Sequence, residues 1–180
     1  MNALLFTVIV TAWATPPAQT ATGGEWQPFT SIDSRLRFEM PMVPKEDYYR
    51  SPDGEGVHIF ACQKDDVTYQ AIAVDLNADI QTAMMEAVSD AESTVGRQIL
   101  NQAVEGFIDG TESKVNKNDY ARFQKFPSRS TVAEMPGNKE ARLMSVLAKS
   151  HLYLFVITAP KAIGNDGLFN RFLKSVQLRN

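Results

Sequence analysis

Acidic and amide side chains around Leu76 have a spacing that can bind calcium. Asp75, Asn77, Asp79 and Glu86 match the first, third, fifth and twelfth positions of an EF-hand loop. The sixth position of that loop needs glycine for its sharp turn, and here it is isoleucine. We therefore interpret the stretch as a strand end followed by a helix start, with Asn77 or Asp79 capping the first amides. We expect no metal site here.

Histidine and cysteine are scarce, since the chain has two histidines and one cysteine. His58 and Cys62 would lie about 13 Å apart on a strand, too far for a Cys–His couple. The apolar flanks of Cys62 predict a buried, unreactive thiol. His151 begins an apolar strand without a second ligand nearby in the sequence, and we interpret it as a turn or surface residue. The sequence also lacks a glycine-rich phosphate loop, G-x-S-x-G and H-E-x-x-H. It predicts no catalytic, cofactor-binding or metal-binding residue.

Four basic residues of the C-terminal half can share one region of a sheet: Arg122, Lys125, Arg129 and Arg142. Such a group can bind an anion or an acidic partner. Basic residues also protect solvated strand edges from aggregation, and we favour that interpretation. The net charge of −3 and the pI of about 5.4 argue against nucleic acid as a partner.

The stretch from Ala141 to Ala159 predicts two strands joined at Lys149 and Ser150. Residues 151–158 are apolar on both faces, which indicates a central strand covered on both sides. Period-two patterns, hairpin spacing and turn residues predict further strands at 26–29, 35–40, 48–50, 57–63, 67–76, 120–126 and 130–135.

Two stretches have the apolar spacing of helices. The first predicts a long helix over about 80–108, which Gly96 can break and Gly110 can end. The second predicts a short helix over about 168–176, capped by Asp166. The order of strands, helix, strands and helix indicates an α+β fold. We expect an α/β/α sandwich with a mainly antiparallel sheet of about six or seven strands and one helix on each face.

The N-terminal residues are typical of an export signal. Residues 1–14 hold a short apolar run that ends in Ala12-Trp13-Ala14, a small-x-small cleavage pattern. An apolar N-terminal strand is the alternative. We predict a signal peptide over 1–14, a disordered linker over 15–25 and a single domain over 26–180. This organisation implies a secreted or periplasmic protein without a stable membrane span after cleavage, because a span needs about 20 apolar residues.

The folded part resembles a known family in its sequence landmarks. The landmarks are Phe29-Thr30-Ser31, Arg37-Phe38-Glu39-Met40-Pro41 with Pro44, Phe126-Pro127 with Arg129, Arg142, Leu152-Tyr153-Leu154 and Phe172-Leu173-Lys174-Ser175-Val176. They resemble an exported bacterial domain similar to PsbP, the extrinsic subunit of the photosystem II oxygen-evolving complex, and to a nuclear import factor that binds Ran. The resemblance implies an α/β/α sandwich with non-enzymatic work in binding or assembly. It assigns no functional residue in this chain.

Three functions remain open at this point. The first, which we favour, is an exported non-catalytic binding or accessory domain with a protein partner and no cofactor. The second is a small-ligand or metal-binding module that uses a cleft at the sheet edge, marked by a deep apolar pocket with convergent polar groups. The third is a hydrolase-like enzyme, which would need an acid–base pair brought together from distant strands.

Overall fold

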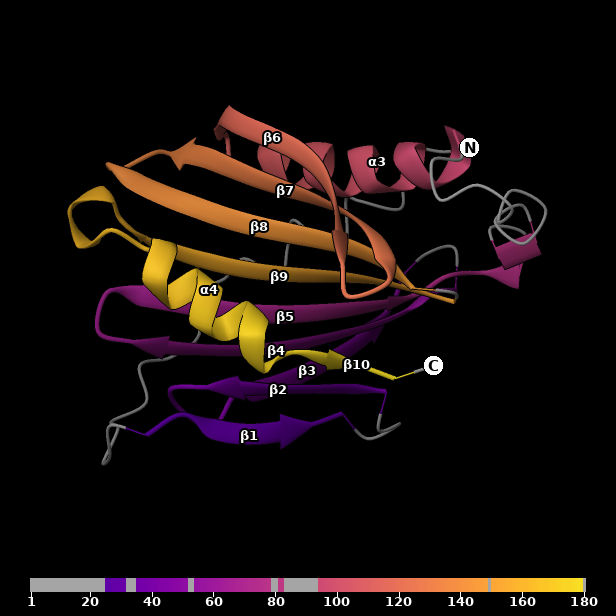
Figure 1. Cartoon of the computed structure of the whole chain (residues 1–180), viewed down its shortest axis with the longest axis horizontal. Helices are drawn as coiled ribbons and strands as arrows, with labels where there is room; N and C mark the ends of the chain where they lie inside the picture. Colours follow the sequence, from indigo (N-terminus) through magenta and orange to yellow (C-terminus); the bar gives the residue numbers. More distant parts are fainter. Residues whose placement is uncertain are drawn as a thin grey trace.

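The computed structural model describes residues 25–31, 35–51, 54–78, 81–82, 94–148 and 150–179. In this part of the chain, a seven-stranded sheet and a three-stranded sheet pack with two long helical segments (Figure 1). The elements are β1 (Gln27–Thr30), β2 (Leu36–Met40), β3 (Lys45–Arg50), β4 (Gly56–Lys64), β5 (Val67–Asp75), α3 (Thr94–Gly110), β6 (Lys114–Phe123), β7 (Phe126–Met135), β8 (Lys139–Ala148), β9 (His151–Pro160), a 3₁₀ turn (Lys161–Ile163), α4 (Asp166–Ser175) and β10 (Gln177–Leu178).

The main sheet has the order β3-β4-β5-β9-β8-β7-β6, and every neighbouring pair is antiparallel. The predicted central strand is β9, which lies between β5 and β8. Tyr153 faces Ala73 of β5 on one side and Val146 of β8 on the other. All residues from His151 to Ile157 are buried, because both faces of this strand are covered.

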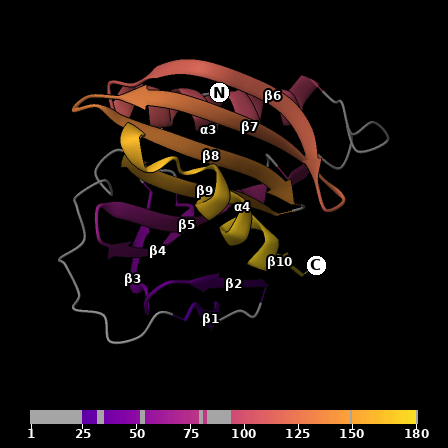
Figure 2. The same ribbon diagram turned by 60° about the vertical axis from the view of Figure 1, so that its left-hand side comes forward.

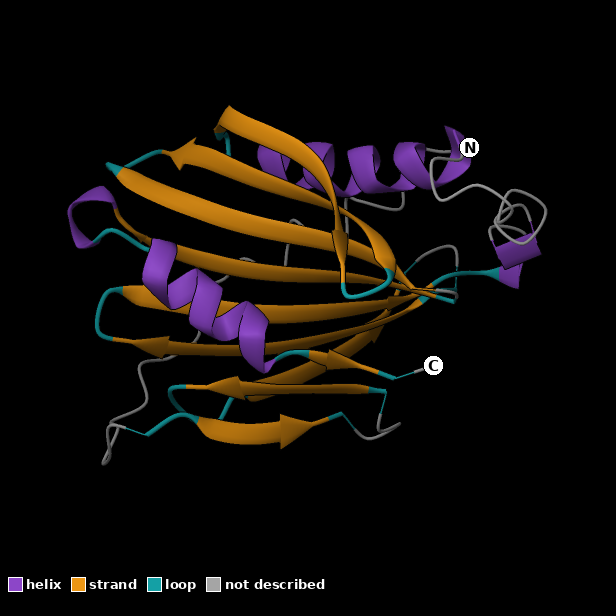
Figure 3. Ribbon diagram, in the orientation of Figure 1, coloured by secondary structure: helices purple, strands orange, loops and turns teal. Residues whose placement is uncertain are grey.

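The two faces of the main sheet belong to two separate apolar cores. On one face Ile72, Leu152 and Leu154 pack with Phe107 of α3. On the other face, Phe155 packs with residues of α4 and of the three-stranded sheet β1-β2-β10. Figures 1 and 2 show α4 crossing the face opposite α3, and Figure 3 shows the same layers by type of structure. The predicted α/β/α sandwich with a mainly antiparallel sheet is confirmed.

The long helix is described over part of its predicted range. Residues 81–82 are helical, residues 83–93 of the predicted helix lie outside the described residues, and α3 runs from Thr94 through Gly96 without a break. Gly110 is its last helical residue rather than the residue after it. The left-handed position belongs to Glu112, with φ of 51°, because the Glu112 amide donates to the Asp109 carbonyl and the Ser113 amide donates to the Ile108 carbonyl.

The strands depart from the prediction where local patterns are weak. The predicted polar connection before Tyr120 contains the first half of β6, an edge strand that is exposed on both faces and so lacks apolar alternation. The turn after β6 lies at Gln124 and Lys125, and Pro127 lies inside β7. Strands β1 and β2 do not join the main sheet but pair with each other and with β10.

The end of the chain shows one further correction. Helix α4 begins at Asp166, and the residue in the cap position is Asn165. The signal peptide, most of the linker, Asp79 and Glu86 lie outside the described residues and stay predictions.

Candidate functional site

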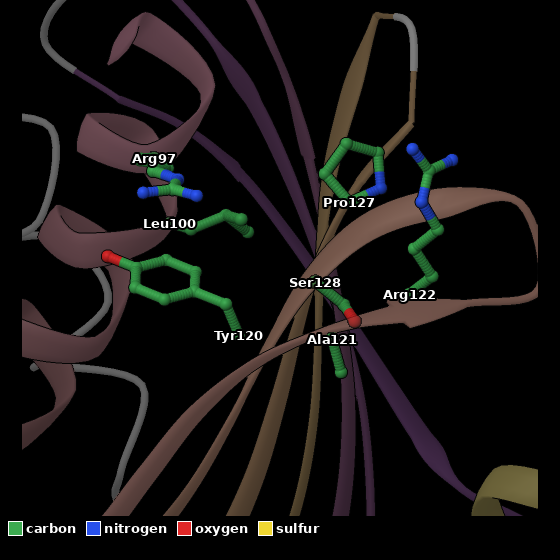
Figure 4. A pocket seen from close by; sticks show the side chains of 7 residues that line it. All are labelled: Arg97, Leu100, Tyr120, Ala121, Arg122, Pro127 and Ser128. Atoms are coloured by element: carbon green, nitrogen blue, oxygen red, sulfur yellow. The ribbon is translucent and has the colours of Figure 1, made fainter. Parts of the chain in front are cut away.

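A groove opens where helix α3 leaves the last strand of the sheet uncovered. The helix packs against β7 and β8, and the adjoining half of β6 forms the far wall. The groove has a volume of about 250 Å³ and is open to solvent. Figure 4 shows its lining side chains, which come from α3, β6 and β7: Arg97, Leu100, Tyr120, Ala121, Arg122, Pro127 and Ser128. We refer to it as the α3–β6 groove.

Arg129 organises the floor beside this groove. Its Nε donates to Asn118 Oδ1 at 2.5 Å and its Nη1 donates to Asn101 Oδ1 at 2.7 Å. The Tyr120 hydroxyl donates to the same Asn101 oxygen. The guanidinium carbons of Arg129 and Arg97 lie over the Tyr120 ring, 5.5 Å and 5.1 Å from its centroid. Two neutral amides therefore fix one arginine, and two cations flank one tyrosine.

Two arginines of this region have no ion-pair partner among the described residues. No carboxylate of that part of the chain lies at ion-pair distance from Arg122 or Arg129. Arg129 is partly buried, while Arg122 is exposed. The electrostatic field of a partly buried cation that only neutral groups contact stays strong, because protein and water screen its charge only in part.

Two of the four basic residues in the predicted cluster therefore come together. Arg142 lies on the opposite face, where its guanidinium contacts Asn165, Asp166 and Glu140. Lys125 belongs to the turn after β6 and lies over the Phe126 ring, 5.5 Å from its centroid. The sequence did not indicate Arg97, Asn101 or Tyr120, which complete the groove.

A second cavity, of about 400 Å³, lies on the face of the sheet that carries β2. Its apolar wall is formed by aromatic and aliphatic side chains, and its polar groups include one carboxylate, two imidazoles and one guanidinium. We call it the Asp75–His151 cavity. The lining residues are Ser31, Arg35, Leu36, His58, Phe60, Ala73, Asp75, His151 and Tyr153.

His151 is the central polar residue of this cavity, and its predicted place at a turn or on the surface is wrong. It is the first residue of β9 and only 7% exposed. Its Nε2 lies 3.0 Å from Asp75 Oδ1, its Nδ1 lies 2.9 Å from Ser150 Oγ, and Arg35 Nη1 lies 3.4 Å from Nε2. The contact with Asp75 is a hydrogen bond when Nε2 carries a proton and donates it to the carboxylate oxygen.

Gly56 makes room for the Asp75 carboxylate. A Cβ at Gly56 would lie 2.5 Å from Asp75 Oδ2, closer than real contacts allow. The missing side chain lets Asp75 lie across its neighbour on β4 while its other oxygen contacts His151 of β9. The carboxylate position therefore depends on three adjacent strands.

The remaining candidate residues are structural in their surroundings. Cys62 is buried, as predicted, and its Sγ lies 3.7 Å from Met40 Sδ. Burial raises the pKa of its thiol to about 12, so the reactive thiolate is absent at neutral pH. His58 Nδ1 lies 3.7 Å from Glu46 Oε1 and does not contact Cys62, which fits the predicted separation.

The predicted strand end and helix start around Asp75 are present. The Asn77 carbonyl accepts from the Gln81 amide, as at a helix start, and its side chain donates to buried Glu55 at 3.1 Å. Among the described residues, no group of three or more histidine, cysteine, aspartate or glutamate side chains is placed to hold a metal ion. No helix in the same residues is both long and apolar enough to cross a membrane.

The layers define an α+β sandwich with one helix on each face of an antiparallel sheet. Within that class, the fold is similar to the solution structure of cyanobacterial PsbP (CyanoP) from Synechocystis sp. PCC 6803. That match has a TM-score of 0.58 at 11% sequence identity and covers 92% of this chain and 99% of the other. The chain therefore has the PsbP-like fold that its landmarks predicted.

Two other solved structures are more distant. A protein from Bacteroides thetaiotaomicron VPI-5482 is 10% identical with a TM-score of 0.47, over 85% of this chain and 48% of that one. PA94, a protein of unknown function from Pseudomonas aeruginosa, is 9% identical with a TM-score of 0.43, over 87% and 99%. No protein-family model matches the sequence, and no curated protein matches it either.

Proposed function

We propose that this protein is an exported, non-catalytic accessory domain that binds an acidic surface of a protein partner through the α3–β6 groove. Arg129 is the observation that carries the proposal. It is partly buried, held by Asn101 and Asn118, and has no carboxylate at ion-pair distance in the described part of the chain. Edge protection does not account for it, because Arg129 lies on β7, an interior strand of the sheet.

The composition and shape of the groove also support a macromolecular partner. Arginine and tyrosine are enriched at the energetic centres of protein interfaces. Tyr120 is 48% exposed, although Asn101 and two guanidinium groups hold its ring in place. A fixed aromatic side chain loses little entropy on binding. The open groove of about 250 Å³ is smaller than typical small-molecule pockets, which range from about 300 to 1,000 Å³.

Export and the absence of catalysis are parts of the same proposal. Export rests on residues 1–14, whose apolar run and small-x-small ending predict a signal peptide. The proposal that the protein is non-catalytic rests on the surroundings of His151. Asp75 is its direct cross-strand neighbour, and Ser150 precedes it in the chain, so sheet pairing explains the first contact and chain adjacency explains the second.

The test is affinity capture from native extract with the full chain and a charge-reversed variant as baits. We expect the wild-type chain to retain an acidic partner in stoichiometric amount. The variant Arg97→Glu/Arg122→Glu should lose that partner by at least about tenfold, because two favourable charge contacts become repulsive. Binding should also weaken as salt rises, since the contacts are exposed at the rim.

The matched control is Arg50→Glu, which reverses an exposed charge on β3 at the opposite edge of the main sheet. It should retain the partner. Equal capture by wild type and the groove variant would overturn the proposal, and so would equal loss with Arg50→Glu.

A second candidate function is small-ligand binding in the Asp75–His151 cavity. Its volume of about 400 Å³ and its apolar wall with convergent polar groups are typical of ligand pockets. A thermal-shift screen with amino acids, carboxylic acids and amines tests it. A hit should lose its stabilising effect in Asp75→Asn and keep it in Arg122→Ala, which changes the other face. Equal stabilisation of both variants would place the ligand elsewhere.

A further inference from the structure

The outer strand β6 is unpaired on one side over its whole described length. It is ten residues long and pairs with β7 alone in the described part of the chain. An edge of this kind is a template for an added strand unless the sequence protects it. Figure 1 shows β6 along the border of the sheet, with α3 behind it.

The two halves of β6 differ in how they are protected as an edge, since the first half has a bulge and two lysines and the second half has charged side chains at Asp119 and Arg122 but no bulge. The register shifts between Val115 and Lys117, which marks a β-bulge. Lys114 and Lys117 also lie in this half, and Lys117 pairs with Asp119 at 3.1 Å. The second half, from Asp119 to Phe123, pairs with β7 in regular register. This half is also the wall of the α3–β6 groove.

The turn after β6 determines which backbone groups point outward. Phe123 and Phe126 flank the two-residue turn, so they form the hydrogen-bonded pair that closes it. Alternation then directs the amides and carbonyls of Tyr120 and Arg122 to the free edge and those of Ala121 to β7. The position of Pro127 opposite Arg122 agrees with this assignment, because proline has no amide to offer there.

The charges select the kind of strand that can be added. Arg122 and Arg129 have no carboxylate at ion-pair distance in the described part of the chain. Arg97 lines the α3 side of the same groove. A second copy of this chain would bring the same cations against each other. A segment with acidic side chains would neutralise them.

We propose that the second half of β6 binds an extended acidic segment of the partner as an eighth strand of the main sheet. The partner strand hydrogen-bonds to the amides and carbonyls of Tyr120 and Arg122. Its side chains alternate in direction, so carboxylates two residues apart, about 7 Å along the strand, both face α3. This inference rests on the proposed function and specifies the chemistry and conformation of the segment that the groove recognises.

The test uses synthetic peptides and the full chain. The probe is a labelled, end-blocked peptide of about eight residues in which glutamate and valine alternate. One control peptide has the same composition in two blocks, and another has lysine in place of glutamate. We expect the alternating acidic peptide to bind at least about tenfold more tightly than either control, because only it presents carboxylates on one face of a strand.

Two variants separate the side chain of residue 122 from its backbone amide. Arg122→Ala removes the charge and should weaken binding about fivefold. Arg122→Pro removes the charge and the edge amide, and should weaken binding about fivefold further. The amide lost in Arg122→Pro does not pair with β7, so its thermal unfolding should match that of Arg122→Ala. Unequal unfolding would contradict the assigned edge position of this amide.

Hydrogen exchange at single amides provides the direct readout. The Tyr120 and Arg122 amides should exchange rapidly in the free protein and slow at least about tenfold with the alternating acidic peptide. Peptide binding without this protection would overturn strand addition and leave the proposed function standing. Protection that rises with protein concentration in the absence of peptide would show that a second copy occupies the edge. Failure of every acidic peptide to bind, while Arg97→Glu/Arg122→Glu still loses a captured partner, would overturn strand addition alone.

Discussion

Buried acids shape the behaviour of the protein at high pH. Burial raises the pKa of Cys62 from 9.0 to about 12 and that of Tyr69 from 10.0 to about 12. Burial also raises the pKa of Tyr49 to about 12, with a smaller contribution from Asp47. The unfolded chain releases these three protons at a lower pH than the folded chain does. The folded state is therefore favoured fully below pH 9.0 and loses that advantage as the pH rises toward about 12.

We expect the free energy of unfolding to decline from about pH 9 upward, with Cys62 responsible for the earliest part. In Cys62→Ala the decline should begin nearer to 10.0, the ordinary pKa of tyrosine. Urea unfolding at a series of alkaline pH values measures both profiles. The same onset in wild type and variant would contradict the role given to Cys62.

The end of α3 stores backbone strain at one exposed residue. Glu112 occupies the left-handed position with φ of 51°, where most helices have glycine. Glu112→Gly should raise the free energy of unfolding by about 0.5 kcal/mol, because the relieved strain exceeds the added flexibility of the unfolded chain. Glu112→Ala keeps the strain and should be neutral. Chemical unfolding of the three proteins tests this, and a glycine variant no more stable than the alanine variant would refute it.

At the scale of elements, Arg142 fastens the start of α4 to β8. Its guanidinium donates to Asn165 and pairs with Asp166 and with Glu140, the last at 3.0 Å. The Asn165 side chain in turn donates to the Glu140 carbonyl at 3.3 Å. This planar fork positions α4, which carries Phe172 into the aromatic core of that face.

Arg142→Lys should destabilise the protein by about 1–2 kcal/mol, because an ammonium group cannot make the three contacts of the fork. Hydrogen exchange of α4 amides should accelerate with it. Arg122→Lys is the control, since Arg122 makes no fork, and it should change stability by less than about 0.5 kcal/mol. Equal effects of the two substitutions would contradict the role of Arg142.

At the scale of the whole molecule, the last described strand pairs with a strand near the start of the described chain. Strand β10 pairs with β2, with Leu178 opposite Leu36, and the Arg179 amide donates to the Arg35 carbonyl at 2.8 Å. The three-stranded sheet therefore joins strands from both ends of the sequence over one apolar core. The α3–β6 groove and the Asp75–His151 cavity lie on opposite faces, so their occupants can be tested independently.

The predicted organisation of the chain also has a direct test. A signal peptide over residues 1–14 should be removed after Ala14 during export, since the small-x-small pattern ends there. Intact-mass measurement of the protein recovered outside the cytoplasm should then give a chain that begins at Thr15. Trp13→Pro keeps the small-x-small pattern and should still be cleaved after Ala14, whereas Ala14→Lys removes a small residue and should block cleavage. An unprocessed chain in the exported fraction would contradict the prediction.

Local patterns of the sequence determined the types of element and their layers. The two-sided apolar pattern of residues 151–158 identified the central strand, because only a strand covered on both faces has no polar side. The apolar spacing in the two helical segments placed one helix on each face. These inferences succeeded because side-chain periodicity depends on neighbours within a few residues.

Only the tertiary structure decided where the functional groups meet. Asp75 and His151 are 76 residues apart in sequence but directly opposite in the sheet. Arg129 and Tyr120 face Asn101 because α3 packs over β7 and β8. No local sequence pattern predicts which strands this helix packs against. The first half of β6 escaped prediction for the same reason. An exposed edge strand buries neither face, so its sequence has no apolar alternation, and only its pairing with β7 makes this half a strand.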